Sequence, residues 1–119
     1  PDLIFLRLGE NGHLGFNQPG TPFGQRTWLS YMDDSLDKRL RRENRIPQDV
    51  KMGGLTLGIK NLMQSKKLVM AANGRNKAQI AEKMVSGPVT QQVPASILQL
   101  HPSCEVILDP QAAEMLAAE

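Results

Sequence analysis

The sequence has few of the residues on which many functional sites depend. It contains one cysteine, two histidines and 4% aromatic residues in a chain of 119. A single cysteine excludes an internal disulfide and favours a reducing compartment such as the cytoplasm. Two well-separated histidines and one cysteine do not make a zinc pattern, so no metal site is expected. Cys104, beside an apolar stretch, and His101, before a proline, are expected to have structural roles.

Long hydrophobic runs are also missing. No apolar run approaches the roughly 20 residues of a transmembrane helix, so no membrane partner is expected. The first residues, PDLIFLRLGE, have no basic flank before their apolar run and do not resemble a signal peptide. Because they begin almost directly on a strand, we expect the chain to be a fragment of a longer one. The formal net charge of +2 does not indicate a nucleic-acid partner.

Strand patterns and helix patterns alternate along the chain. Near-continuous apolar runs predict buried, parallel strands, and apolar residues at helical spacing predict helices. This alternation is typical of an α/β fold around a mainly parallel sheet, and the length suffices for one domain. The predicted strands cover 3–8, 28–31, 67–72 and 104–109, and the predicted helices cover a segment ending at Pro47, 55–63, 76–85 and 110–118, with a short helical turn at 94–102.

The glycine-rich loop LGENGHLGFNQPG contains the first candidate for a functional residue. It begins at the end of the first predicted strand, and ligands of open α/β sheets bind beyond the carboxyl ends of the strands. An imidazole with an unperturbed pKa of about 6.5 can give or take a proton near neutral pH, so His13 is suited to acid–base chemistry. The alternative is a turn histidine bonded to the backbone, and the residues alone leave both interpretations open.

Two groups of cations are candidates for anion binding. Arg75 and Lys77 lie at the start of a predicted helix, where the helix dipole favours anions rather than cations. A phosphate bound between them and the free backbone N–H groups would explain their position, and simple exposure to water is the alternative. The five cations between Lys38 and Arg45 form a solvated helix face, a phosphate-binding lid or a nucleic-acid patch, the last disfavoured by the lack of interleaved aromatics.

Three stretches, in this order and at these spacings, resemble one enzyme family: LGENGHLGFNQPG, LTLGIKNLM and SILQLHP. The sequence resembles the amino-sugar-phosphate deaminase/isomerase family, whose members act on glucosamine 6-phosphate or galactosamine 6-phosphate. The likeness runs from Leu3 to about Leu116 and covers only the C-terminal half or so of a family member. It implies that residues 1–119 are the C-terminal half of one domain with a Rossmann-like, three-layer αβα fold and a mainly parallel sheet.

The resemblance also implies an activity and roles for particular residues. A hexosamine 6-phosphate, with galactosamine 6-phosphate favoured, is converted to a ketohexose 6-phosphate and ammonia without any cofactor. His13 falls on the family's ring-opening histidine, and Lys77 matches the lysine that binds the substrate phosphate. Arg41 or Arg42 lies near a second phosphate-binding arginine, and 33–49 corresponds to a mobile lid over the site.

Asn11 and Gln18 depart from the pattern of the glucosamine enzymes, which have carboxylates at both positions to orient the histidine. Galactosamine-type members are closer to this chain at Asn11. We expect both amides to belong to the catalytic site, with Glu10 as an electrostatic substitute. The family's aspartate base and phosphate-cradling turn belong to the other half of the domain. Residues 1–119 alone are therefore expected to be inactive, and to need that half or a homo-oligomer contact to cover the sheet.

Two other functions stay open from the sequence. The related 6-phosphogluconolactonases also carry a glycine–histidine pair here, but they follow it with a serine-containing stretch where this chain has LGFNQP. Sugar-phosphate sensor domains of some bacterial transcription regulators share the fold and bind their effector without converting it. The amides Asn11 and Gln18 would suit such a sensor, whereas His13 favours an enzyme.

Overall fold

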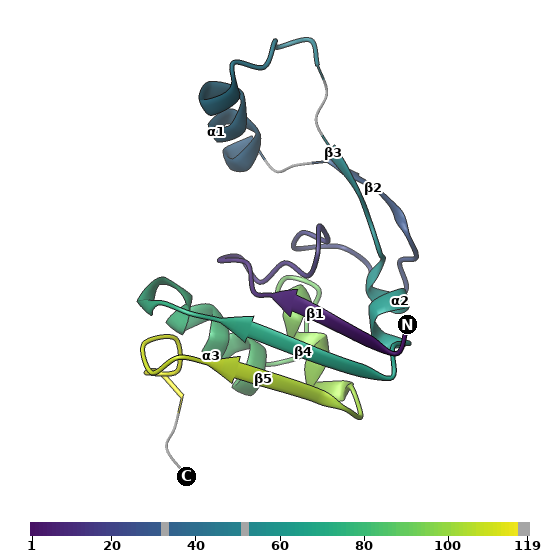
Figure 1. Ribbon diagram of the computed structural model, residues 1–119, viewed down its shortest axis with the longest axis vertical. Helices are drawn as coiled ribbons and strands as arrows, with labels where there is room; N and C mark the ends of the chain where they lie inside the picture. The colour runs from purple at the N-terminus through teal and green to yellow at the C-terminus, as the bar shows by residue number, and fades with distance from the viewer. Residues whose placement is uncertain (32–33, 51–52, 117–119) are drawn as a thin grey trace.

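A parallel sheet of three strands forms the centre of the protein (Figure 1). The computed structural model describes residues 1–31, 34–50 and 53–116. The strands β1 (Leu3–Arg7), β4 (Lys67–Ala72) and β5 (Cys104–Leu108) lie in the order β1-β4-β5. Both pairings are parallel, which confirms the predicted α/β fold with a mainly parallel sheet.

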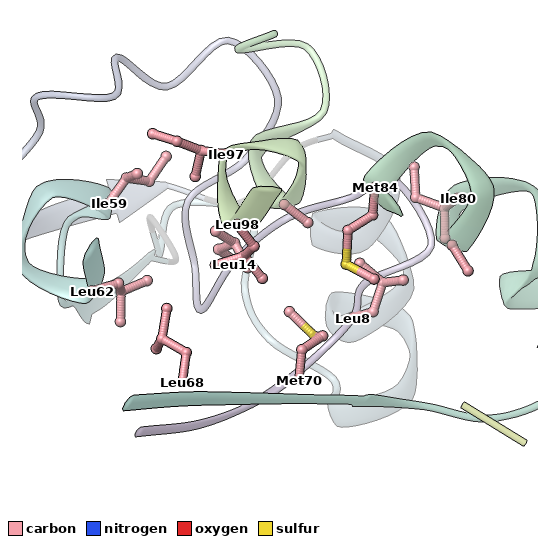
Figure 2. Close-up of a cluster of buried hydrophobic side chains, with 12 residues drawn as sticks. Leu8, Leu14, Ile59, Leu62, Leu68, Met70, Ile80, Met84, Ile97 and Leu98 are labelled. Atoms are coloured by element: carbon pink, nitrogen blue, oxygen red, sulfur yellow. The ribbon is translucent and has the colours of Figure 1, made fainter. Parts of the chain in front are cut away.

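One face of this sheet carries the hydrophobic core. Leu68 and Met70, fully buried in the central strand, point toward the helical layer, as Figure 2 shows. The opposite face is open in the described part of the chain, where Phe5 is 73% exposed. The described residues therefore supply two of the three layers expected of the fold. The buried core residues are Leu8, Leu14, Ile59, Leu62, Leu68, Met70, Ile80, Ala81, Met84, Ala95, Ile97 and Leu98.

The helices of this layer are short. They are α2 (Ile59–Met63), the 3₁₀ turn η1 (Arg75–Lys77) that leads into α3 (Ala78–Ser86), and the 3₁₀ segment η2 (Pro94–Leu100). The predicted helix at 76–85 and the helical turn at 94–102 are thereby confirmed. None of the helices that the structure describes is long and apolar enough to cross a membrane.

An arm projects from this body (Figure 1). Its stem consists of the antiparallel strands β2 (Trp28–Tyr31) and β3 (Gly53–Thr56), and its far end carries α1 (Asp34–Asn44). The prediction of a helix over 55–63 is wrong at its start. Leu55 pairs with Leu29 in the stem and is 81% exposed, and the helix covers only the last part of the predicted range. The extended backbone of Gly58 separates β3 from α2.

The helix predicted over 110–118 does not form in the described residues, where 110–115 are turns. Asp109 begins this segment as a helix N-cap would, because its carboxylate accepts the N–H of Ala112 (2.8 Å). The backbone hydrogen bonds that follow, from Glu114 to Gln111 (3.4 Å) and from Leu116 to Ala113 (3.0 Å), each span three residues, so the chain tightens into turns instead of an α-helix. The same carboxylate accepts the N–H of Gly74 and ties the chain after β5 to the segment that leads into α3. Residues 117–118 lie outside the described residues.

His101 and Cys104 have the structural roles expected of them. His101 is buried, and its Nδ1 accepts the N–H of Ser103 at 3.0 Å. A neutral imidazole then carries its proton on Nε2, which donates to the carbonyl of Ser65 at 2.9 Å. Cys104 packs against the core, and burial raises the pKa of its thiol, which disfavours the reactive thiolate.

Candidate functional site

The loop after β1 is anchored on both sides of His13. The N–H of Leu8 donates to the carbonyl of Ala71 at 3.2 Å and so extends the pairing of β1 with β4. The side chains of Leu8 and Leu14 are buried in the core. Between them the backbone turns through Gly12, whose φ is 87°, and a Cβ there would lie 2.9 Å from Val93 Cγ1. His13 is therefore presented by a short, fixed loop at the carboxyl edge of the sheet.

Gly9 provides the space for the imidazole of His13. A Cβ on Gly9 would lie 2.1 Å from Cδ2 and 2.2 Å from Nε2 of His13, far inside van der Waals contact. Any side chain at position 9 would displace the ring.

Asn11 and Gln18 form an amide pair in this loop. Asn11 Nδ2 donates to Gln18 Oε1 at 3.0 Å, while Asn11 Oδ1 accepts the backbone N–H of His13 at 3.1 Å. The structure thus brings these three predicted residues together. Gln18 Nε2 is buried and has no hydrogen-bond partner among the described residues. Asn11 thus contributes to the site by fixing the backbone of His13 through this hydrogen bond.

Lys77 reaches the same loop from η1. Its Nζ donates to the carbonyl of Leu8 at 2.5 Å, which places the ammonium at the end of β1. Its neighbours bind other protein groups. Arg75 Nε pairs with the Glu114 carboxylate (3.0 Å), and Asn76 Nδ2 donates to Glu10 Oε1 (2.7 Å). Of the two cations at this helix start, Lys77 is the one directed at the His13 loop.

Arg41 and Arg42 lie in the arm on α1. With Asp37, Lys38, Ile46 and Gln48 they line a cavity of about 360 Å³. The Arg41 guanidinium binds the Asp37 carboxylate and the carbonyls of Pro47 and Val50, so its donors connect α1 to the segment that follows it. Arg42 is exposed. The structure places both arginines in this cavity of the arm, and the residues gathered at the His13 loop are Asn11, Gln18 and Lys77.

Proton transfer and anion binding are the chemistry that these groups can perform. His13 can exchange a proton, and Lys77 offers a positive charge at the Leu8 carbonyl, where the His13 loop begins. Across the described ranges, no group of three or more His, Cys, Asp or Glu side chains is arranged to hold a metal ion. Fold and loop together define a class: a Rossmann-like α/β protein with a histidine and a lysine at the carboxyl edge of its parallel sheet.

Comparisons with known proteins show which proteins the chain resembles. The chain is 43% identical over 115 residues to glucosamine-6-phosphate deaminase of Listeria monocytogenes serotype 4b, an alignment covering 97% of this chain and 49% of that protein. A solved monomeric glucosamine-6-phosphate deaminase matches with a TM-score of 0.82 and 34% identity, over 96% of this chain and 47% of the other. The chain is thus similar in sequence and in fold to glucosamine-6-phosphate deaminases. It spans about half the length of the curated relatives it matches.

A more distant structure agrees in fold only. The 6-phosphogluconolactonase of Trypanosoma cruzi has a TM-score of 0.73 but 17% identity, covering 98% of this chain and 41% of that one. No family model matches the chain. The predicted Rossmann-like fold and the family resemblance are both confirmed.

Gly9 and Asn17 are the two residues of this loop that sequence reasoning missed. Gly9 looks like any glycine of a turn, and only the position of the His13 ring distinguishes it. Asn17 is fully buried, which is unusual for an amide in a polar loop.

Replacing Gly9 with alanine is expected to displace the imidazole of His13. In ¹H–¹³C spectra, the His13 ring signals should move while those of His101 stay in place. Turnover that uses His13 should fall by at least about 10-fold, since a misplacement of about 1 Å can cost 10²-fold. Gly24→Ala is the matched control, because a Cβ there meets nothing within 4 Å. Unmoved His13 signals in Gly9→Ala would contradict this prediction.

Proposed function

We propose that the protein containing this chain deaminates a hexosamine 6-phosphate, producing a ketohexose 6-phosphate and ammonia without a cofactor. The observation that carries the proposal is the arrangement at the end of β1. The His13 ring lies over Gly9, and the Lys77 ammonium lies at the Leu8 carbonyl. The 43% identity to a curated glucosamine-6-phosphate deaminase supports it.

His13 and Lys77 have different roles in the proposed reaction. His13 passes a proton to and from the sugar ring oxygen as the ring opens, which is general acid–base chemistry. Lys77 binds the 6-phosphate, with its ammonium already desolvated on one side by the bond to the Leu8 carbonyl. Asn11 and Gln18 hold the loop so that the His13 ring keeps its orientation.

Arg42 is the second phosphate ligand that we propose, and the lid containing it is the part of the arm beyond its stem. Arg41 is the weaker candidate, since Asp37 and two backbone carbonyls already occupy its guanidinium. Arg42, one residue further along α1, is exposed beside the same cavity. The lid corresponds to 33–49, of which residue 33 lies outside the described residues.

The rest of the site belongs to the other half of the domain in this proposal. Residues 1–119 form the C-terminal half, and the base that moves the proton between carbons is supplied from elsewhere. Two observations support this: the chain spans about half the length of its curated relatives, and one face of the described sheet is open. The 119 residues alone therefore do not turn over. The cytoplasm is the proposed compartment, in accord with the free thiol of Cys104.

The test is an assay of the full-length protein with both hexosamine epimers. Ammonia and ketohexose 6-phosphate should form in equal amounts from glucosamine 6-phosphate or galactosamine 6-phosphate, and the faster substrate identifies the epimer. The amide at Asn11 favours the galactosamine epimer. Hydrolysis of 6-phosphogluconolactone without ammonia release would overturn the proposal. So would tight binding of both sugar phosphates without turnover, the behaviour of a sensor.

Gln18→Glu is expected to raise kcat of the full-length enzyme. A carboxylate at position 18 would place a negative charge in the His13 loop, one hydrogen-bonded residue away through Asn11, and so stabilise the protonated imidazole, which the amide does not do. A gain of about fivefold, equivalent to about 1 kcal/mol, is the expected size. Gln92→Glu adds the same charge at an exposed site and should leave kcat unchanged. No change or a loss in Gln18→Glu would mean that the amide is the working residue.

A further inference from the structure

Asn17 is a fully buried amide whose hydrogen bonds are satisfied in an unusual way. It is 0% exposed, so its polar atoms need partners inside the protein. Its Nδ2 donates to two backbone carbonyls, those of Leu14 and Leu57, each at 2.9 Å. Its Oδ1 accepts the indole N–H of Trp28 at 2.8 Å. Both donor hydrogens and the carbonyl oxygen of the amide are therefore used.

The partners of Asn17 come from three segments. Leu14 is the neighbour of His13, and a backbone bridge joins it to Asn17 itself, with N···O distances of 2.8 and 3.2 Å. Trp28 is the first residue of β2, and Leu57 follows the last residue of β3. One side chain thus connects the His13 loop to both strands that form the stem of the arm.

Other close contacts make this junction stiff. The N–H of Phe16 donates to Thr56 Oγ1 on β3 at 3.1 Å. A Cβ on Gly15 would lie 2.9 Å from the same oxygen, so the loop backbone lies directly against the stem. At the base of the stem, a Cβ on Gly58 would lie 2.0 Å from the carbonyl oxygen of Gln25. The stem cannot shift at this point without displacing residues 14–17.

We propose that Asn17 is a positioning residue that locks the His13 loop to the stem of the arm, so that a displacement of the arm is transmitted to His13. Arg42 lies on α1 of the arm, and His13 lies in the loop after β1. Binding of a phosphate in the arm would then change the position of His13 through the Asn17 amide. For turnover this inference rests on the proposed function, but the mechanical link between loop and stem does not.

Trp28→Phe tests the link from the side of the stem. Phenylalanine keeps most of the apolar ring but removes the N–H that Asn17 Oδ1 accepts. In the full-length protein, the ¹H–¹³C ring signals of His13, assigned with His13→Gln, should shift, while those of His101 stay unchanged. Thr27→Val is the matched control. It removes the 3.3 Å hydrogen bond from the residue just before β2 to Asn61 on α2, which does not involve the loop, and should leave His13 unmoved.

Asn17→Asp tests the link from the side of the loop. The aspartate keeps the shape and can accept from Trp28, but loses both donors and faces two carbonyl oxygens. We expect kcat to fall by about 10-fold with KM nearly unchanged, because the reacting group is misplaced while phosphate binding is retained.

The outcomes separate this inference from the proposed function. Unmoved His13 signals in Trp28→Phe, or equal shifts in Thr27→Val, would overturn the link. A shift of His13 in a protein that releases no ammonia would sustain the link and overturn the proposed function. If Asn17→Asp does not fold, Trp28→Phe alone decides.

Discussion

Replacing His13 with glutamine in the full-length protein is expected to lower kcat for ammonia release by about 10²- to 10⁴-fold, the usual contribution of a general acid–base group. Glutamine keeps hydrogen-bonding capacity at this position but cannot exchange a proton near neutral pH. KM should change little, because the proposed phosphate ligands, Lys77 and Arg42, are untouched. Steady-state kinetics with the better hexosamine 6-phosphate measures both quantities.

His101→Gln is the control for this prediction, since it removes the other histidine of the chain. It breaks the hydrogen bonds to Ser65 and Ser103 in the body of the protein, so the melting temperature should fall while kcat is retained. If His13→Gln keeps more than about a tenth of the wild-type kcat, His13 is not the proton-transfer group.

Much of the sheet could be predicted because its signals are local. Leu68, Val69 and Met70 are buried one after another, which is typical of a central parallel strand. The strand predicted at 28–31 is confirmed as β2, but its partner in the stem, β3, was harder to predict. Leu55 stands four residues before Ile59 and so fits a helical pattern, but its neighbours across the stem decide its conformation. A strand that buries little of its surface has no hydrophobic alternation to reveal it.

The candidate site could be predicted only in part, for a related reason. His13 was recognisable because it follows a strand and lies among glycines. Asn17 depends on Leu57, which is 40 residues away in the sequence, so nothing local indicates that its amide is buried. The same limit applies to the choice between Arg41 and Arg42. Asp37 lies four residues before Arg41 and suggests an ion pair, but the carbonyls that complete its binding come from after α1.

Lys77→Met is expected to lower kcat/KM for hexosamine 6-phosphates by about 10²- to 10³-fold, since it removes a charged partner of the bound phosphate. Methionine fills a similar volume, but its thioether cannot donate to the Leu8 carbonyl, so a stability loss of about 1 kcal/mol should accompany the change. Inorganic phosphate should inhibit the variant far less than the wild type. Lys83→Met removes the same charge from an exposed position of α3 and should behave as wild type.

An assay with the free amino sugar distinguishes a role of Lys77 in phosphate binding from a role in supporting the His13 loop. If Lys77 holds the phosphate, glucosamine itself should react equally slowly with both proteins, whereas an equal loss with glucosamine would mean that Lys77 acts only by supporting the His13 loop.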